Sequence, residues 1–472
     1  MAGQLSPLRS APPRSPVRTA QDGPGPSSAA GQAGHPAARS TLGDWLAKER
    51  AQEKTERGQL LASALPGGGG AMKRLKARAA RQHPATVADK WHARLNGAPK
   101  PIVDGKRRAA FEALVRADAM ALARFGQIDP RLAADKMRAA VEDGTLGDGI
   151  LAEDRKLLLE VLNQCTDPTD HLYQRLNLKI MPDTLPAYTD AQVVEKPAHL
   201  TSGTFASVFA LKVEKSNGVV QDSVFKPLKA TEQGWVGKWS GIPMDDPQAA
   251  MRNIATVSCA KKLGLDVIAN TQLAIIDTGR GPLDPDLGLL MERAPGKQAR
   301  DVGADTLKNP AVFKEVTKLQ LLDHLTGQVD RHPNNYFIHV GSNGDVKVTG
   351  IDNDQCFGKD LLRPSDIRPL SGLPFHGTEL PPVIDTAMAS MIGGLGDDEL
   401  HAMLDDKLSD EEIEAAVSRL QGIRLHVDQL RRDGWVIAPD RWDSPEVQGR
   451  FNAQNSYIGR ELSKKPQVLA AG

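Results

Sequence analysis

The segment at residues 330–335 reads DRHPNN and places an acid, two cations and two amides inside an otherwise apolar stretch. Before it, apolar residues recur at helical spacing over residues 312–325, and Gly327 follows as a helix C-cap would. After it, the runs 336–340 and 346–351 flank a Gly-Ser-Asn-Gly turn, which predicts two paired strands. The chain is therefore constrained to a buried helix, a polar loop and a hairpin in succession.

The predicted second strand ends in acidic residues, Asp352-Asn353-Asp354. This arrangement would bring Asp330 and Asn335 of the loop close to Asp352. Hard oxygen ligands beside a further carboxylate suit Mg²⁺, which takes its remaining ligands from water and phosphate. In phosphoryl transfer an additional Asp orients or deprotonates the acceptor hydroxyl. An ordinary salt bridge beside a polar turn is the alternative, but it does not account for the acidic strand end.

The two motifs resemble those of a known enzyme family. The loop 330–335, together with residues 351–354 and 357–358, resembles the catalytic and metal-binding loops of atypical kinases related to phosphatidylinositol 3- and 4-kinases. It is also similar to the secretory-pathway protein kinases, whose metal motif is Asp-Asn-Gly. Asp354 stands in place of that glycine, which leaves open whether a second carboxylate joins the metal.

The resemblance implies ATP as the phosphoryl donor and Mg²⁺ as the cofactor, with Mn²⁺ as an alternative. We expect His332 to brace the loop, because Asp330 already provides the acid–base group. The implied catalytic residues are Asp330, Arg331 and His332, and the implied metal ligands are Asn335, Asp352 and Asp354.

A strand, turn and strand are predicted over residues 201–211, and an ordinary hairpin is the alternative reading. Gly203, Thr204 and Ser207 lie at or beside the tip, where a nucleotide phosphate could approach the backbone. We expect these three residues to bind the cofactor nucleotide.

Lys226 ends the next apolar strand and resembles the ATP-binding lysine of the type II phosphatidylinositol 4-kinases. A lysine there is a point charge for the α- and β-phosphates, and Lys229 is its nearby competitor. Residues 289–296 resemble the hinge between kinase lobes, with backbone groups from Met291 to Arg293 facing adenine and Met291 and Glu292 as the expected cofactor-binding residues.

A helix is predicted to start at Asp246-Pro247. It resembles the family helix that carries an acid paired with the strand lysine, but it offers Arg252 and Asn253 instead. Glu232 and Asp245 of the preceding loop are the alternative candidates for that acid.

With 472 residues the chain is long enough for two or three domains. We expect an α+β fold: a two-lobed protein-kinase-like domain flanked by N-terminal and C-terminal helices, behind a disordered leader. The expected parts are a leader with short helices at 1–100, a helical layer at 105–180, the catalytic domain at 185–390 and a helical extension at 391–472.

Residues 1–40 are rich in Ala, Pro, Ser and Gly and contain four Arg and one acid, which predicts disorder. Such a start is compatible with a type III secretion signal, an organelle transit peptide or a plain disordered tail. With the kinase motifs it resembles an effector injected into host cells, for which a secretion chaperone would be a further partner; the bacterial cytoplasm is the alternative location. No apolar run is long enough for a membrane span.

The formal net charge of +0 gives no reason to expect a nucleic-acid partner. A host protein is favoured as phosphoryl acceptor over a phosphoinositide, because the cations Lys359, Arg363 and Arg368 are sparse and interspersed with acids. A pseudokinase scaffold and a nucleotidyl transferase are the alternative functions.

Overall fold

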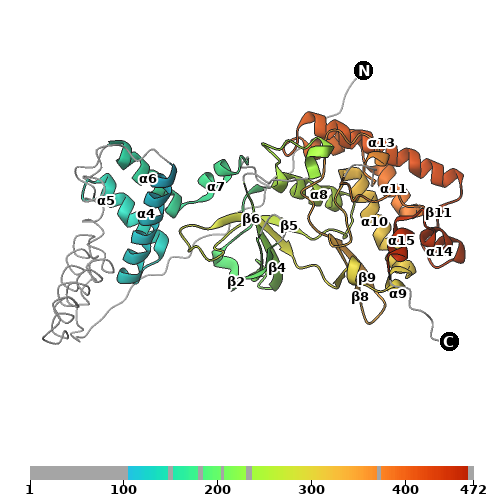
Figure 1. The fold of residues 1–472 in the computed structure, drawn as a ribbon, viewed down its shortest axis with the longest axis horizontal. Coiled ribbons are helices and arrows are strands. Elements are labelled where there is room, and N and C mark those ends of the chain that lie inside the picture. Colours follow the sequence, from blue (N-terminus) through green and yellow to red (C-terminus); the bar gives the residue numbers. More distant parts are fainter. Residues whose placement is uncertain are drawn as a thin grey trace, which may run out of the picture. The chain divides into compact units, whose positions relative to one another are not determined.

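The computed structural model describes residues 105–146, 152–178, 184–202, 207–229, 236–368 and 374–465 (Figure 1). The predicted leader at 1–100, the tip residues Gly203 and Thr204, and Glu232 lie outside the described residues.

Helices precede the first sheet. They are α4 (Gly105–Gly126), α5 (Pro130–Glu142), α6 (Ala152–Thr166) and α7 (Thr169–Arg175). The first three pack on one another, and Asp129 caps α5 by accepting from the amides of Arg131 and Leu132. Helix α7 contributes Leu172 and Tyr173 to the apolar cluster beneath the sheet.

A mixed sheet of six strands follows, in the order β1-β5-β6-β4-β3-β2, with only the β1–β5 pair parallel. Its strands are β1 (Tyr188–Thr189), β2 (Val193–Ser202), β3 (Ser207–Glu214), β4 (Val220–Pro227), β5 (Thr271–Ile276) and β6 (Asp286–Glu292). In β4, Phe225 is buried in the apolar cluster of the sheet. Since successive side chains point to opposite faces, Lys226 lies on the other face of this inner strand.

Helix α8 (Ala249–Lys262) connects β4 to β5 in the chain. The predicted start at Asp246-Pro247 is wrong by a few residues. The residue before the helix, Gln248, has a left-handed backbone with φ +48°. Its side-chain Nε2 donates to Asp246 Oδ1 at 2.7 Å. The Asp246 carboxylate therefore binds a side chain instead of capping the helix.

After β6 the chain enters a three-stranded antiparallel sheet, β7-β8-β9, with α10 against β9 (Figure 1). The elements are β7 (Lys297–Gln298), α9 (Ala304–Leu307), α10 (Pro310–Thr326), β8 (Tyr336–Val340) and β9 (Val346–Gly350). The predicted helix, C-cap and hairpin are confirmed. Gly327 adopts φ +69°, which Gly does at no steric cost, and the Asp330 loop follows.

The C-terminal part is mostly helical, as predicted. It contains β10 (Ile384–Asp385), α11 (Thr386–Gly394), α12 (Asp397–Leu404), α13 (Asp410–Arg432), β11 (Val436–Ile437), α14 (Pro445–Asn452) and α15 (Tyr457–Ser463). These helices share one large apolar core with α8, α10 and the second sheet. The mixed α and β character expected from the sequence is confirmed. None of the described helices combines the length and apolar character that a bilayer crossing requires.

Candidate functional site

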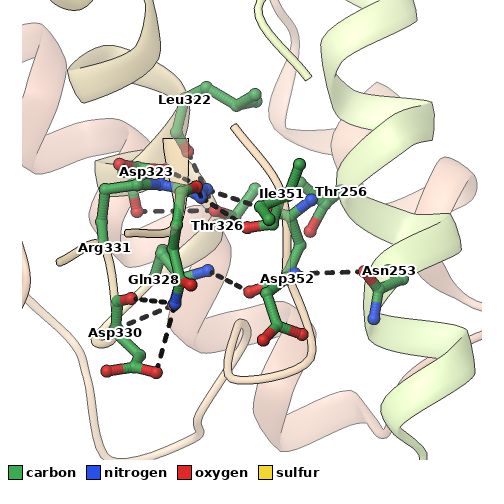
Figure 2. A network of polar contacts seen from close by, with 12 residues as sticks. Asn253, Thr256, Leu322, Asp323, Thr326, Gln328, Asp330, Arg331, Ile351 and Asp352 are labelled. Carbon is green, nitrogen blue, oxygen red and sulfur yellow. Dashed lines mark hydrogen bonds and ion pairs between the residues drawn. The ribbon is translucent and has the colours of Figure 1, made fainter. Parts of the chain in front are cut away.

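Arg331 forms the centre of the loop that follows α10 (Figure 2). Its Nε and Nη2 donate to the Asp323 carboxylate on α10, and Nη2 also donates to Asn353 Oδ1 at 2.6 Å. Its Nη1 donates to the carbonyls of Asn335 and Ile351, each at 2.7 Å. A guanidinium has five N–H donors, and these contacts use all of them.

Arg331 is therefore a buried brace that joins the end of α10, the polar loop and the end of β9. No donor is left for a substrate, so we revise its predicted catalytic role to a positioning role.

Gln328 connects the two acidic motifs, and sequence reasoning missed it. Its side chain is buried, its Oε1 accepts from the Asp330 amide at 2.9 Å, and its Nε2 donates to the Asp352 carbonyl at 3.2 Å (Figure 2). A lone Gln after a helix-ending Gly carries no signal in the sequence. Its role becomes visible only when the loop and the strand end lie side by side.

The Asp330 side chain is 17% exposed and lies among polar partners. Asn335 Nδ2 donates to the Asp330 carbonyl at 2.9 Å and lies 3.4 Å from Oδ2, and Gln355 Nε2 lies 3.5 Å from the same oxygen. Burial raises the pKa of Asp330 to about 6, with a smaller upward contribution from Asp352. A carboxyl with that pKa can accept and return a proton near neutral pH.

His332 contacts the same loop. Its Nδ1 accepts from the Asn334 amide at 3.2 Å, its Nε2 lies 3.8 Å from Asp330 Oδ2, and its ring meets that of His376 edge-on at 5.8 Å. Burial lowers its pKa, so the neutral ring prevails at neutral pH. These contacts suit the bracing role expected for it.

Lys226 reaches from β4 to both acids of the strand-end motif. Its Nζ lies 2.7 Å from Asp352 Oδ1 and 3.0 Å from Asp354 Oδ2. Burial lowers the Lys226 pKa, but the two carboxylates outweigh this effect and hold the pKa well above its usual value. Asp354, which stands where the related motif has Gly, therefore belongs to the same cluster.

The backbone of the strand-end loop is unusual. Asp352 and Phe357 have φ values of +58° and +62°, in the region that non-glycine residues rarely adopt. The loop is held in place by Asn253 of α8, whose Oδ1 accepts from the Asn353 amide at 3.1 Å (Figure 2). Such strain persists where surrounding contacts fix it, and it is concentrated at functional sites.

Among the described residues, the predicted substitute Asp245 does not pair with Lys226. Glu232 lies outside them, Asp245 is exposed, and the acids that contact Lys226 are Asp352 and Asp354. On α8, Asn253 binds the strand-end loop instead of the lysine.

Of the predicted nucleotide-binding residues besides Lys226, the structure describes Ser207, Met291 and Glu292. Ser207 begins β3 and is exposed, while Met291 is buried and Glu292 ends β6. The amides of Glu292 and Arg293 donate to the carbonyls of Asn270 and Asp222 at 3.0 and 3.1 Å. These two amides are therefore not available to adenine, contrary to the expectation for this part of the hinge.

The residues expected to hold Mg²⁺ fit a cation. Asp352 and Asp354 already converge on one positive charge, that of the Lys226 ammonium. Asn335, almost buried, adds an amide next to Asp330. Within the described residues, no cluster of three or more His, Cys, Asp or Glu side chains has the arrangement of a metal site. Two carboxylates and an amide are nevertheless a donor set that Mg²⁺ accepts when phosphate and water complete its shell.

Neither models of protein families nor curated proteins match this sequence. The residues and their geometry are thus the basis for assigning a function.

Proposed function

We propose that the protein is an ATP- and Mg²⁺-dependent kinase that transfers the γ-phosphoryl group to a hydroxyl. The observation that carries this proposal is the contact of Lys226 with Asp352 and Asp354. These two acids lie 126 and 128 residues after the lysine in the chain. Gln328 links this cluster to Asp330. One cation and three carboxylates in such an arrangement supply what phosphoryl transfer needs: charge neutralisation, positioning and a proton acceptor.

Each residue has a separate task in this proposal. Lys226 binds the α- and β-phosphates as a point charge, and Asp330 orients the acceptor hydroxyl and takes its proton. Asp352, Asp354 and Asn335 hold Mg²⁺, which when bound neutralises charge on the phosphates. Lys226 must release at least one carboxylate when nucleotide arrives, because its ammonium now occupies the place between them.

The order of elements supports a two-lobed kinase-like fold. Strands β2, β3 and β4 are followed by α8, β5 and β6, and a short connection leads to the second sheet and α10. The connection from β6 to β7 then acts as the hinge. Ser207, with Gly203 and Thr204 before it, covers the phosphates in this proposal.

A protein is the acceptor that we favour over a phosphoinositide. Of the cations that follow the metal motif, Lys359 pairs with Glu411 at 2.6 Å and Arg363 with Asp366 at 2.9 Å. Cations already paired with acids attract an anionic lipid headgroup weakly.

A nucleotide-binding pseudokinase is the second candidate. The observation that favours it lies on α8, where the kinases that the motifs resemble carry an acid paired with the lysine. In this protein Asn253 of that helix binds the backbone of the strand-end loop and does not contact Lys226. A nucleotidyl transferase would use the same cluster of Lys226, Asp352 and Asp354, but with ATP bound in the flipped orientation so that the nucleotidyl group is transferred.

We further propose that the kinase acts as a type III secreted effector in the host cytoplasm, on the basis of the composition of residues 1–40. Deletion of these residues should abolish delivery of a reporter fusion into host cells while the purified kinase keeps its rate.

The function is tested by incubating the purified protein with Mg²⁺ and either γ-labelled or α-labelled ATP, together with host lysate or phosphoinositide vesicles. We expect γ-label on protein. Label on lipid would identify a lipid kinase, and transfer of α-label a nucleotidyl transferase. Nucleotide binding without transfer of either label would establish the pseudokinase and overturn the proposal.

A further inference from the structure

Arg252 on α8 is a fully buried cation next to the strand-end loop, outside the set of residues proposed to bind nucleotide or metal. Its Nη1 donates to the carbonyls of Cys356 at 2.8 Å and Phe357 at 3.2 Å. Its Nη2 pairs with Glu412, the third residue of α13. It thus joins the loop that begins at Asp352 to a helix of the C-terminal part.

Glu412 is also buried, and it accepts hydrogen bonds from Ser409, the residue before α13. The Ser409 amide and hydroxyl each donate to Glu412 Oε2 at 3.0 Å, and the amide bond is the one that an N3 glutamate makes to the N-cap residue in a capping box. A cavity of about 310 Å³ lies against the pair and is lined by Met251 of α8, by Glu412 of α13 and by Leu408 just before that helix. At this point the ion pair bridges α8 and the start of α13.

Helix α13 contacts the loop a second time, two turns later. Arg419 is buried, its Nη1 donates to the Leu361 carbonyl at 2.6 Å, and its Nε donates to the Leu325 carbonyl of α10 at 3.1 Å. The two buried arginines, one on α8 and one on α13, therefore both bind backbone carbonyls of residues 356–361.

We infer that Arg252 and Glu412 are positioning residues through which α13 sets the geometry of the Asp352–Phe357 loop, so that the C-terminal helices are part of the catalytic apparatus. This inference rests on the proposed kinase function. A lysine–acid pair would normally fix such a helix against the site, but Lys226 is engaged with Asp352 and Asp354. Arg252 and Asn253 make that connection from α8 instead, through the loop backbone.

The experiment must separate positioning from stability. Removing one member of a buried ion pair is strongly destabilising, whereas replacing both by apolar residues of similar volume is often neutral or stabilising. The double variant Arg252→Met/Glu412→Met removes the donors to Cys356 and Phe357 without leaving a buried charge. Glu411→Gln is the matched control, since Glu411 precedes Glu412 on α13 and forms an exposed pair with Lys359.

We expect the double variant to unfold at a temperature close to that of the wild type, with kcat about 10- to 100-fold lower and KM for ATP changed far less. Amide hydrogen exchange at residues 353–357 should be faster, and Glu411→Gln should match the wild type in all readouts. Glu412→Gln keeps the side-chain shape and an oxygen acceptor for Arg252 but removes its counter-charge, so it should lower the unfolding temperature while the protein still folds at the assay temperature. It should change kcat and exchange in the same direction by a smaller factor.

A folded double variant with wild-type kcat and wild-type exchange would overturn the inference. If the double variant does not fold, a Glu412→Gln variant with unchanged kcat and exchange would overturn it as well. Should the wild type itself transfer no phosphate, the kinase proposal fails, but the exchange measurement still decides whether α13 positions the loop.

Discussion

Lys226 is the residue on which nucleotide binding depends in this account. Its ammonium is enclosed by two carboxylates, whereas Lys229 lies beyond the end of β4 and lines a cavity with Asp245 and Asp246. The sequence contains both lysines, and the strand register also separates them: Lys226 pairs with Leu289 on β6 within an inner strand, whereas β4 ends before Lys229.

Lys226→Ala should therefore raise the KM for ATP and lower kcat by several orders of magnitude, because the phosphates lose their fixed positive charge. Lys229→Ala should leave both parameters nearly unchanged. Steady-state kinetics of the two variants checks this, and the reverse ranking would refute the placement of Lys226.

Asp330 and Asn335 should have separable effects. Asp330→Asn keeps the polar shape but removes the proton acceptor, so turnover should be lost while Mg-ATP still raises the unfolding temperature. Asn335→Ala should weaken both Mg-ATP binding and turnover, because it removes a ligand of the metal. Thermal-shift titration beside a turnover assay separates the two; normal turnover of Asp330→Asn would rule out Asp330 as the base.

At the scale of elements, the sequence predicted the helix, loop and hairpin around residues 310–350 well. Their apolar periodicity and their Gly and Asn turn residues are local signals. The long-range contacts were not predictable in this way. The pairing of Arg331 with Asp323, the Gln328 bridge and the contacts of Arg252 depend on which elements pack together, which no local pattern records.

The pairing of α10 with its loop predicts a large effect on stability. Asp323→Ala leaves the buried Arg331 without its carboxylate, and we expect a loss of about 3–5 kcal/mol in the free energy of unfolding. Glu315→Ala on the same helix, which removes the more exposed pair with Lys318, should cost less than about 1 kcal/mol. Urea denaturation measures both, and equal losses would contradict the bracing role of Arg331.

At the scale of the whole molecule, the large core that joins α8, α10 and the C-terminal helices surrounds a helix that carries a buried titratable side chain. His324 is buried in α10, and burial lowers its pKa to about 4, with Arg419 and His426 acting in the same direction. The unfolded chain has a His pKa near 6.5, so protonation favours unfolding. The stability that the neutral ring contributes is therefore complete above about pH 6.5 and is lost as the pH falls toward 4.

We expect wild type to lose about 2 kcal/mol more between pH 7 and pH 5 than a His324→Gln variant, which has no group to protonate at this position. Denaturant unfolding at the two pH values measures the difference. An identical pH dependence in both proteins would show that His324 is not responsible.

The central claim is that Asp352 belongs to a working phosphotransfer site. Its left-handed backbone makes Asn the appropriate replacement, because Asn tolerates this conformation and keeps the side-chain shape. The decisive measurement is the rate of γ-label transfer from Mg-ATP by wild type and Asp352→Asn, with thermal unfolding of both. The account predicts transfer by the wild type, a rate at least about 1000-fold lower in the variant, and little change in unfolding temperature. Transfer at the wild-type rate by a folded Asp352→Asn would contradict it.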